Sequence, residues 1–584
     1  MQEYPFSKPE KSAIPGKILI CFFAIFLFLQ PTEKLACLPP EKIIHPGDWA
    51  YDAIYILSRE KGIIFFADSR VTVGQMEKFL LEIDPETLSE SGRVVYDQLT
   101  AYLESDYWLG FNTDAVSGGL DLMLQPEVYY KTNEDVPWIY DHHSRNSLIL
   151  MPWGFSLGPW ITAEMELNVG QNEYASYLHE NYVNIPLDPV SQFDIHFPRR
   201  TYVSAGLPVG RASGFNFTIG LGDNFFGKTQ TGSVIISEDL ERIIYGQITI
   251  YSPAFKYTAQ IMQYNVNKYH YMHFFQVRLF KKLSVSIAEG VMANAPLELR
   301  FMNPFAIFHS YESYKSYTDY NEDLGHQPNK GDDPWYKDYD RTYDPTGGSR
   351  IGSYLGIKIE FQPFKYFRIY GLMAMDQLQL GVEKKNWSES LTPNALAFQA
   401  GIDFSIPIKA AYLEFGLEGV YIYPYMYVLW DKAWSFYKDV PEVDNMTLRY
   451  WTGSPFGPDT IAGAFSAGFS SNGAFKTYDK YYAGLTFIFS ARGERSEYTI
   501  FDVDNSIDDT YRPTNKVYDV TVPPTGTPVF GYTIQLTGEY YPTKYLSLSL
   551  RPGYRIHVNA YHIEGRIEHG FEMSFSLRFR PPVL

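Results

Sequence analysis

The sequence lacks the residues on which several common protein classes depend. Only two of its 584 residues are cysteines, Cys21 and Cys37, so we expect neither a disulfide framework nor a thiolate metal site. Lysine and arginine number 49 against 67 acidic residues, and this formal net charge of -18 argues against nucleic acid, whose phosphates attract basic side chains. The longest apolar run, residues 18–29, is shorter than the about 20 residues of a membrane-spanning helix.

Aromatic residues, in contrast, are abundant, with 48 tyrosines and 41 phenylalanines. The mean hydropathy is nevertheless slightly negative. Aromatic side chains favour strands, and strands that alternate apolar with polar residues keep the average hydropathy low. This composition therefore favours strands with one apolar face over a bundle of membrane helices.

The N-terminus is typical of an export signal. Lys11 and Lys17 precede the apolar run, which has the length of a secretory h-region. We expect a signal peptide over residues 1–36, cleaved after Ala36. The residues around Cys37 partly resemble a lipoprotein box, so lipidation of this cysteine stays open beside ordinary cleavage.

Residues 47–104 change to helical spacing and predict three helices. The signals are Tyr51, Ile54, Tyr55 and Leu57 on one stripe, Gly62 as a helix end, Thr72 and Gln75 as a capping box, and Ser89 at the start of the third helix. The run Asp48-Trp49-Ala50-Tyr51 and the run Val71-Thr72-Val73-Gly74-Gln75 resemble one degenerate S-layer-homology unit. Such units usually work in threes, so anchoring to wall material is the less favoured interpretation. We prefer a small helical periplasmic domain that packs its apolar stripes against a barrel mouth as a plug or cap.

Residues 107–580 predict an antiparallel transmembrane β-barrel, so the fold class is all-β. From Tyr532 to Tyr540 apolar and polar residues alternate over one membrane-crossing length, the chain turns at residues 541–544, and the alternation resumes from Leu546. The length of this region predicts about 18 strands, an even number being expected. A soluble β-sandwich also alternates, but it needs neither aromatic rims nor an export leader.

The connections differ at the two ends of the predicted strands. Residues 280–282 and 362–367 resemble the short periplasmic turns of bacterial barrels, whereas residues 317–350 and 430–459 fit long outward-facing loops. The last strand, residues 571–579, resembles the C-terminal signal read by barrel-assembly machinery, although five further residues follow it. We therefore expect an outer-membrane location, with membrane lipid and that machinery as partners.

If the apolar face of each strand meets lipid, the alternate residues point into the lumen. They include Glu360, Glu414 and Glu418, so the interior is charged. Two interpretations remain open: a cation-biased pore, and a lumen plugged by ionic and hydrogen-bonded side chains.

One acidic and aromatic stretch, residues 321–348, has the composition of a sugar-binding surface. Aromatic faces stack on pyranose rings while carboxylates accept hydrogen bonds from hydroxyl groups. The candidate glycan contacts are Trp335, Tyr336, Tyr339, Asp338 and Asp340. The alternative, which we favour, is an ordinary acidic loop that binds calcium loosely.

A further stretch carries a family resemblance. Ser286-Ile287-Ala288-Glu289-Gly290, followed by Leu297-Glu298-Leu299-Arg300-Phe301-Met302-Asn303-Pro304-Phe305, resembles a segment of the capsule-assembly outer-membrane family of the Wzi type. The resemblance implies that surface polysaccharide is retained and that Glu289, Arg300 and Asn303 belong to a shared motif. Plain strand-turn chemistry, with Glu289 as a lumen carboxylate, is the alternative.

No catalytic constellation stands out, because residues 463–468 have the wrong spacing for a nucleophile elbow. We expect a non-enzymatic protein without a cofactor and without nucleic acid as partner. Three functions remain: a barrel that binds surface polysaccharide, which the resemblance favours, an outer-membrane channel or porin for small solutes, and a surface adhesin.

Overall fold

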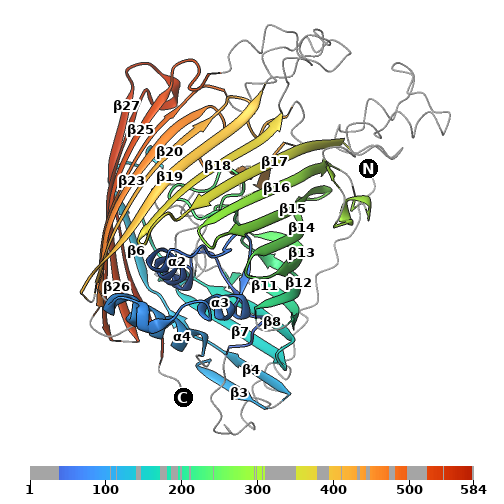
Figure 1. Cartoon of the computed structure of the whole chain (residues 1–584). Helices are drawn as coiled ribbons and strands as arrows, with labels where there is room; N and C mark the ends of the chain where they lie inside the picture. The colour runs from blue at the N-terminus through green and yellow to red at the C-terminus, as the bar shows by residue number, and fades with distance from the viewer. Residues whose placement is uncertain are drawn as a thin grey trace, which may run out of the picture.

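The structure is a computed structural model in which a ring of strands surrounds a small helical region (Figure 1). The residues that it describes are 38–104, 107–113, 115–137, 139, 146–170, 181–185, 195–196, 200–209, 212–240, 242–294, 296–297, 299–304, 307–308, 350–377, 394–409, 411–429, 435–441, 447–471, 480–495, 522–543 and 545–581. The predicted signal peptide, residues 1–36, lies outside them.

Eighteen strands form a closed antiparallel barrel, which confirms the fold class and the strand number expected from the sequence. The first strand is interrupted and consists of β4 (Val116–Leu120), β5 (Met123–Leu124) and β6 (Glu127–Lys131). The others are, in order, β7 (Ile149–Leu157), β8 (Ile161–Val169), β11 (Thr201–Val209), β12 (Ser213–Gly222), β13 (Ile243–Tyr251), β14 (Phe255–Asn265), β15 (Lys268–Leu279), β16 (Leu283–Asn294), β17 (Arg350–Phe361), β18 (Phe367–Gln377), β19 (Ala395–Ile408), β20 (Ala411–Ile422), β23 (Thr460–Ser471), β24 (Lys480–Arg492), β25 (Val529–Thr543), β26 (Leu546–Val558) and β27 (Ile567–Phe579).

The ring closes where the last strand pairs with the first. Phe579 of β27 lies opposite Leu124 of β5, and Glu572 lies opposite Lys131 of β6. The short strand β3 (Leu109–Asn112) pairs with β4, and the two-residue strands β9 (Tyr182–Val183) and β10 (Ile195–His196) pair with β6 and β8. Because every wall strand has neighbours on both sides, the sheet has no open edge to pair with another chain.

The two faces of the wall differ as a membrane barrel requires. On β25, Ile534 and Leu536 are 47% and 51% exposed on the outside, whereas Thr533 is 7% exposed on the inside. The same alternation places apolar side chains outward around the ring, including Phe217, Ile250, Ile287, Ile359, Leu417, Phe465, Phe487, Leu550 and Phe575. The outside is thus an apolar belt suited to lipid, and the inside is polar. Among the described helices, none is both long and apolar enough to cross a membrane.

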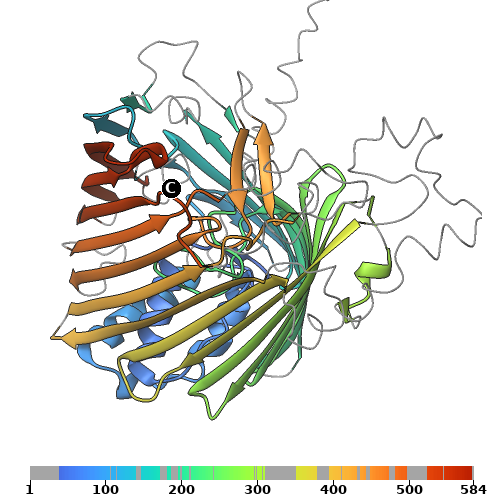
Figure 2. The ribbon, with the colours of Figure 1, turned by 90° about the horizontal axis from the view of Figure 1, so that it is seen from above.

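The helical region, residues 38–104, sits inside one end of the ring (Figures 1 and 2). It contains β1 (Ile43–Ile44), α2 (Trp49–Lys61), β2 (Val71–Thr72), α3 (Val73–Leu80), the short 3-10 helix η1 (Pro85–Thr87) and α4 (Glu90–Leu103). The caps follow the sequence signals: the Thr72 side chain accepts from the Gln75 backbone N–H, and Gly62 ends α2 at a φ of 64°, which favours glycine.

The apolar stripes of the three helices pack against one another rather than against the barrel mouth. Tyr51, Ile54 and Leu57 of α2 share one buried cluster with Val95 and Leu99 of α4. Among the clustered residues, only Phe225 and Tyr412 come from outside residues 38–104. The expected docking through apolar stripes is therefore wrong, and the contacts with the wall are mainly polar, as described below.

Two connections from the opposite rim fold into the lumen. The first inward loop, residues 223–240, follows β12, and the second inward loop comprises residues 423–429, 435–441 and 447–459 between β20 and β23, with the hairpin of β21 (Tyr437–Pro441) and β22 (Thr447–Trp451). The expectation that residues 430–459 face outward is wrong for the described part, because Phe436, Tyr437 and Trp451 are buried in the lumen.

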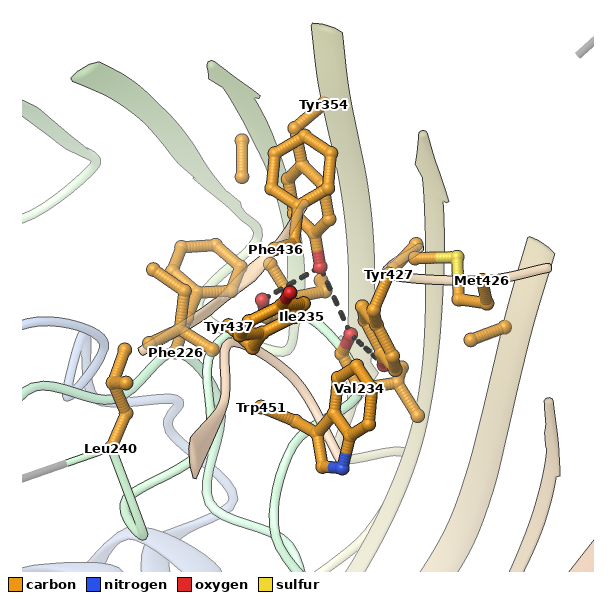
Figure 3. Packing of buried hydrophobic residues seen from close by; sticks show 14 of the residues in the cluster. Phe226, Val234, Ile235, Leu240, Tyr354, Met426, Tyr427, Phe436, Tyr437 and Trp451 are labelled. Atoms are coloured by element: carbon orange, nitrogen blue, oxygen red, sulfur yellow. Dashed lines mark hydrogen bonds between the residues drawn. The ribbon is translucent and has the colours of Figure 1, made fainter. Parts of the chain in front are cut away.

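The inward loops share a core with the wall, shown in Figure 3. Tyr354 of β17 donates its hydroxyl to the backbone oxygens of Val234 at 3.1 Å and Ile235 at 2.7 Å, and Tyr427 donates to Val234 at 2.7 Å. Phe436 packs at 4.8 Å from the ring of Tyr354. Large inward side chains on β13 to β18 and the two loops thus fill one half of the lumen.

Candidate functional site

The other half of the lumen contains a cavity of about 1070 Å³. Its walls come from the helical region, the first inward loop, β23 to β27 and the first strands of the ring. The cavity opens beside the part of β23 whose inward residues are small, Ser466, Gly468 and Ser470. Ser547 of β26 also lines it, and Tyr545 in the turn before β26 shows that the cavity reaches the rim of short turns.

Predicted lumen carboxylates bind the helical region to the wall. Glu360 forms ion pairs with Arg368 at 3.1 Å and with Lys358 at 3.4 Å, and all three side chains are almost fully buried. Lys358 also forms an ion pair with Asp68 of the helical region. Arg368 is itself held by Asp403 at 2.6 Å. This network joins three wall strands to the helical region.

Glu414 also binds the helical region to the wall, near the rim of short turns. Its carboxylate accepts from Arg59 of α2 at 3.2 Å and from Ser405 at 3.2 Å. Nearby, the backbone N–H of Tyr366 donates to the carbonyl of Arg59, and the Ser91 hydroxyl donates to the carbonyl of Ala411 at 3.0 Å. The helical region is therefore fixed to the short turns as well as to the wall.

Glu418 holds the first inward loop. It accepts from the backbone N–H groups of Gln230 at 3.0 Å and Thr231 at 3.1 Å, and from the hydroxyl of Tyr370 at 2.6 Å. Lys228 of the same loop forms an ion pair with Asp52 of α2. The loop and the helical region thus meet at the centre of the lumen.

At the wall formed by β8, Lys42 of the helical region lies 2.9 Å from Glu164. Burial opposes the charge on Lys42, but Glu164 and its neighbours outweigh this effect and raise the pKa of Lys42. Arg200 bridges Glu166 at 3.7 Å and Asp223 at 2.5 Å. The lumen charges are thus largely paired with one another, which favours the plugged interpretation for this half of the ring.

Glu238 is an exception among the described residues. It projects from the first inward loop into the cavity, and no described side chain forms an ion pair with it. Enclosure by the barrel and the neighbouring Asp239 raise the pKa of Glu238 to about 7, while Lys228 opposes this effect. Within the described residues, no cluster of histidine, cysteine and carboxylate side chains could hold a metal ion.

The structure corrects the expected position of Glu289. It lies on the same face of β16 as Ile287, which is 43% exposed on the outside, so Glu289 does not point into the lumen. The 3-10 helix η3 (Leu299–Met302) packs over this part of the outer wall (Figure 2), where Phe301 and Phe308 cover Tyr271 and Val291. Phe308 also packs against the ring of His273, the residue opposite Glu289 on β15.

The remaining motif residues lie with η3 outside the ring. Asn303 is exposed there, and of Arg300 only the backbone is described. The structure therefore brings together Glu360, Glu414 and Glu418 but leaves the motif residues on the other side of the wall. The candidate glycan contacts Trp335, Tyr336, Tyr339, Asp338 and Asp340 lie outside the described residues.

The sequence contains one local signal for the cavity. Small residues recur at every second position from Ala462 to Ser470, and this period on an inward face predicts missing volume. Arg551 and Arg578 alternate with apolar residues of their own strands, so their inward face is local, whereas Gln230 lies on a loop whose inward fold the sequence does not indicate.

A closed antiparallel ring of eighteen strands, apolar outside and polar inside, defines an outer-membrane β-barrel. No family model and no curated protein matches the sequence. Among solved structures, the chain is similar to Wzi of Escherichia coli, described as an outer membrane protein involved in group 1 capsule assembly and a carbohydrate-binding β-barrel. The two are 11% identical over 92% of this chain and 99% of that chain, with a TM-score of 0.50.

Two further solved structures are similar at lower scores. OprD of Pseudomonas aeruginosa is 10% identical over 80% of this chain and 96% of that chain, with a TM-score of 0.35. DcaP of Acinetobacter baumannii, described as an outer membrane channel, is 8% identical over 80% and 99%, with a TM-score of 0.33. The similarity to Wzi supports the fold, and the two lower scores add no further argument.

Proposed function

We propose that this protein is a non-enzymatic outer-membrane barrel that binds and retains a surface polysaccharide. The observation that carries the proposal is the filling of the lumen from both ends, by the helical region at the rim of short turns and by the inward loops at the other. Ion-paired elements at the centre of a ring suit a sealed binding barrel better than a diffusion channel. The carbohydrate-binding description of Wzi supports the same class of ligand.

The cavity has the chemistry that such a ligand needs. Tyr482 and Tyr541 line it, and aromatic side chains suit stacking on sugar rings. Carboxylates and amides in the same walls accept and donate hydrogen bonds to hydroxyl groups. In this proposal the helical region faces the periplasm, and outer-membrane lipid and the barrel-assembly machinery are the other partners.

Two measurements test the proposal. Purified protein in a planar lipid bilayer is expected to show no stable single-channel steps, whereas regular steps would contradict a sealed barrel. Cells that carry the intact chain are expected to retain more of their surface glycan than cells without it. Deletion of residues 321–348 distinguishes between two binding sites, the loop predicted from the sequence and the lumen cavity. Unchanged glycan retention after this deletion would assign the binding to the cavity.

A solute channel is the second candidate, and the cavity beside α2 favours it, because this part of the lumen is unfilled and polar. In such a channel, the helical region forms the narrowest part of the path for solutes. Conductance that appears only when Lys42–Glu164 and Arg59–Glu414 are broken together, by Lys42→Ala with Arg59→Ala, supports a gated channel. A barrel that stays closed in this double variant supports the binding function.

A further inference from the structure

The seam, where β27 meets the interrupted first strand, is held differently from the other edge of β27. Each residue of β27 pairs with β26. Towards the first strand, β27 pairs at residues 572–576, opposite β6, and beyond them only at Phe579, opposite Leu124 of β5, among the described residues. Between these points the first strand contains Pro126, which has no N–H to donate. The end of the seam beside the short turns therefore has few backbone bonds.

An ion pair closes this end of the seam, and we call it the latch. Arg580, just past β27, donates from Nη2 to both carboxylate oxygens of Asp121 at 2.8 Å and from Nε at 3.2 Å. The N–H of Leu577 donates to the carbonyl of Pro126 at 3.0 Å. The two side chains of the latch are 27% and 20% exposed, so water shares their charges. The latch therefore costs less to break than the buried ion pairs that hold the helical region.

The two sides of the seam differ in polarity. On the inside the cavity reaches the seam, and its lining there includes Asp121, Gln125, Arg578 and Arg580. On the outside the seam presents exposed apolar and aromatic side chains: Val128, Tyr130, Phe575 and Phe579. A wall one strand thick thus separates a polar cavity from lipid at the place where that wall has few backbone bonds.

The rim of short turns marks the depth at which this end of the seam lies. Trp160, Phe280 and Phe364 are exposed in three of these turns, and aromatic side chains favour the interface between membrane and water. Phe579 belongs to the same rim, because it pairs with Leu546, the first residue of β26 after its turn. The weakly bonded end of the seam is therefore level with the head groups of the lipid.

We propose that the seam is a lateral gate, which opens beside the short turns and admits the polar head of a membrane phospholipid into the cavity while the hydrocarbon tail stays in the bilayer. Opening breaks the latch, the pairing of Phe579 with Leu124 and the bond donated by Leu577. Residues 572–576 stay paired with β6 and keep the ring intact. The freed N–H and C=O groups lie at the depth of the head groups, so water and the lipid head can satisfy them.

The test uses the full chain in phospholipid vesicles, with Ser466→Cys as a reporter inside the cavity and Cys37→Ser as the background. One probe is a phospholipid whose head group carries a maleimide, and the other is a charged, water-soluble maleimide. Arg580→Ala removes the latch and is expected to raise labelling by the lipid probe about threefold to tenfold. Labelling by the water-soluble probe is expected to stay at the parental rate, because the cavity already reaches the rim of short turns. Arg566→Ala, which removes an ion pair of 2.9 Å with Glu568 at the opposite rim, is the matched control and is expected to change neither rate.

A disulfide across the seam is a second, independent variant. Leu124→Cys with Phe579→Cys places two cysteines at directly opposite positions, where a disulfide can form. In the Arg580→Ala background this bridge is expected to return labelling by the lipid probe to the parental rate. A control bridge between β16 and β17, Ile287→Cys with Ile357→Cys, is expected to leave the rate raised. Heat-modifiable gel mobility of each variant shows that the ring has closed.

Asp121→Asn breaks the latch from the first strand and decides the matter without a bridge. It is expected to match Arg580→Ala, and the double variant is expected to label no faster, because both changes remove the same ion pair. An unchanged lipid-probe rate in both single variants, an equal rise with both probes, or lipid labelling that survives the seam bridge overturns the gate. None of these outcomes depends on glycan binding, so the proposed function is tested separately.

Discussion

Asp68 gives the sharpest test of how the helical region is held in the barrel. Its side chain is 1% exposed, forms an ion pair with Lys358 and accepts from the amide of Gln276. Replacement by asparagine keeps the shape and removes the charge. Lys358, whose side chain is 3% exposed, is then left with Glu360 alone at 3.4 Å, a carboxylate already bound by Arg368.

The loss of one partner from a buried ion pair costs about 3–5 kcal/mol, since it leaves an uncompensated charge away from water. Asparagine retains the contact with Gln276, so we take the lower end, about 3 kcal/mol. At about 1.4 kcal/mol for each factor of ten, Asp68→Asn raises the population in which the helical region has left the lumen by about two orders of magnitude. The ring itself is expected to stay intact.

Cysteine labelling measures this population. Ser91 is buried where α4 meets the wall, and the barrel itself contains no cysteine. In a Cys37→Ser background, the rate at which Ser91→Cys reacts with a maleimide reports how often the helical region undocks. Asp97→Asn, on the exposed face of α4, is the matched control and is expected to label at the parental rate. A parental rate in Asp68→Asn as well would show that this ion pair does not hold the helical region.

Two further predictions follow from the wall and the cavity. Leu536→Arg, in the middle of the lipid face of β25, is expected to destabilise the barrel by about 2–4 kcal/mol when it refolds into lipid vesicles without detergent, whereas Thr537→Arg on the lumen face is tolerated; equal losses would contradict the assigned faces. Gly468→Trp fills the cavity and is expected to abolish glycan binding while heat-modifiable mobility persists; retained binding would move the site elsewhere.

The wall was predictable because, in a membrane barrel, the alternation within a single strand shows which of its faces meets lipid. The alternation from Tyr532 to Tyr540 gives the lipid side without knowledge of any other strand. The helices were predictable for the same reason, since Thr72 caps the start of α3 and Gly62 ends α2, and both act within their own helix.

The inward loops were not predictable, because whether a connection folds out or in depends on space that other strands leave. Residues 430–459 are rich in aromatic side chains, which suit both a surface loop and a lumen core. Glu289 lies two residues after Ile287 on β16, so local alternation places it on the outer face, as observed. The expectation of a lumen carboxylate was therefore wrong although the local pattern gives the correct face. Long-range packing decided only the position of the inward loops.

The seam between β27 and the first strand has a consequence for when the protein becomes functional. The cavity takes side chains from Lys42 near the beginning of the chain to Arg580 near its end, and Phe579 meets Leu124 only when the ring shuts. No partial assembly therefore offers the complete set of ligand contacts. A molecule that recognises this cavity distinguishes finished barrels from unfinished ones, so ligand capture by itself reports that biogenesis is complete.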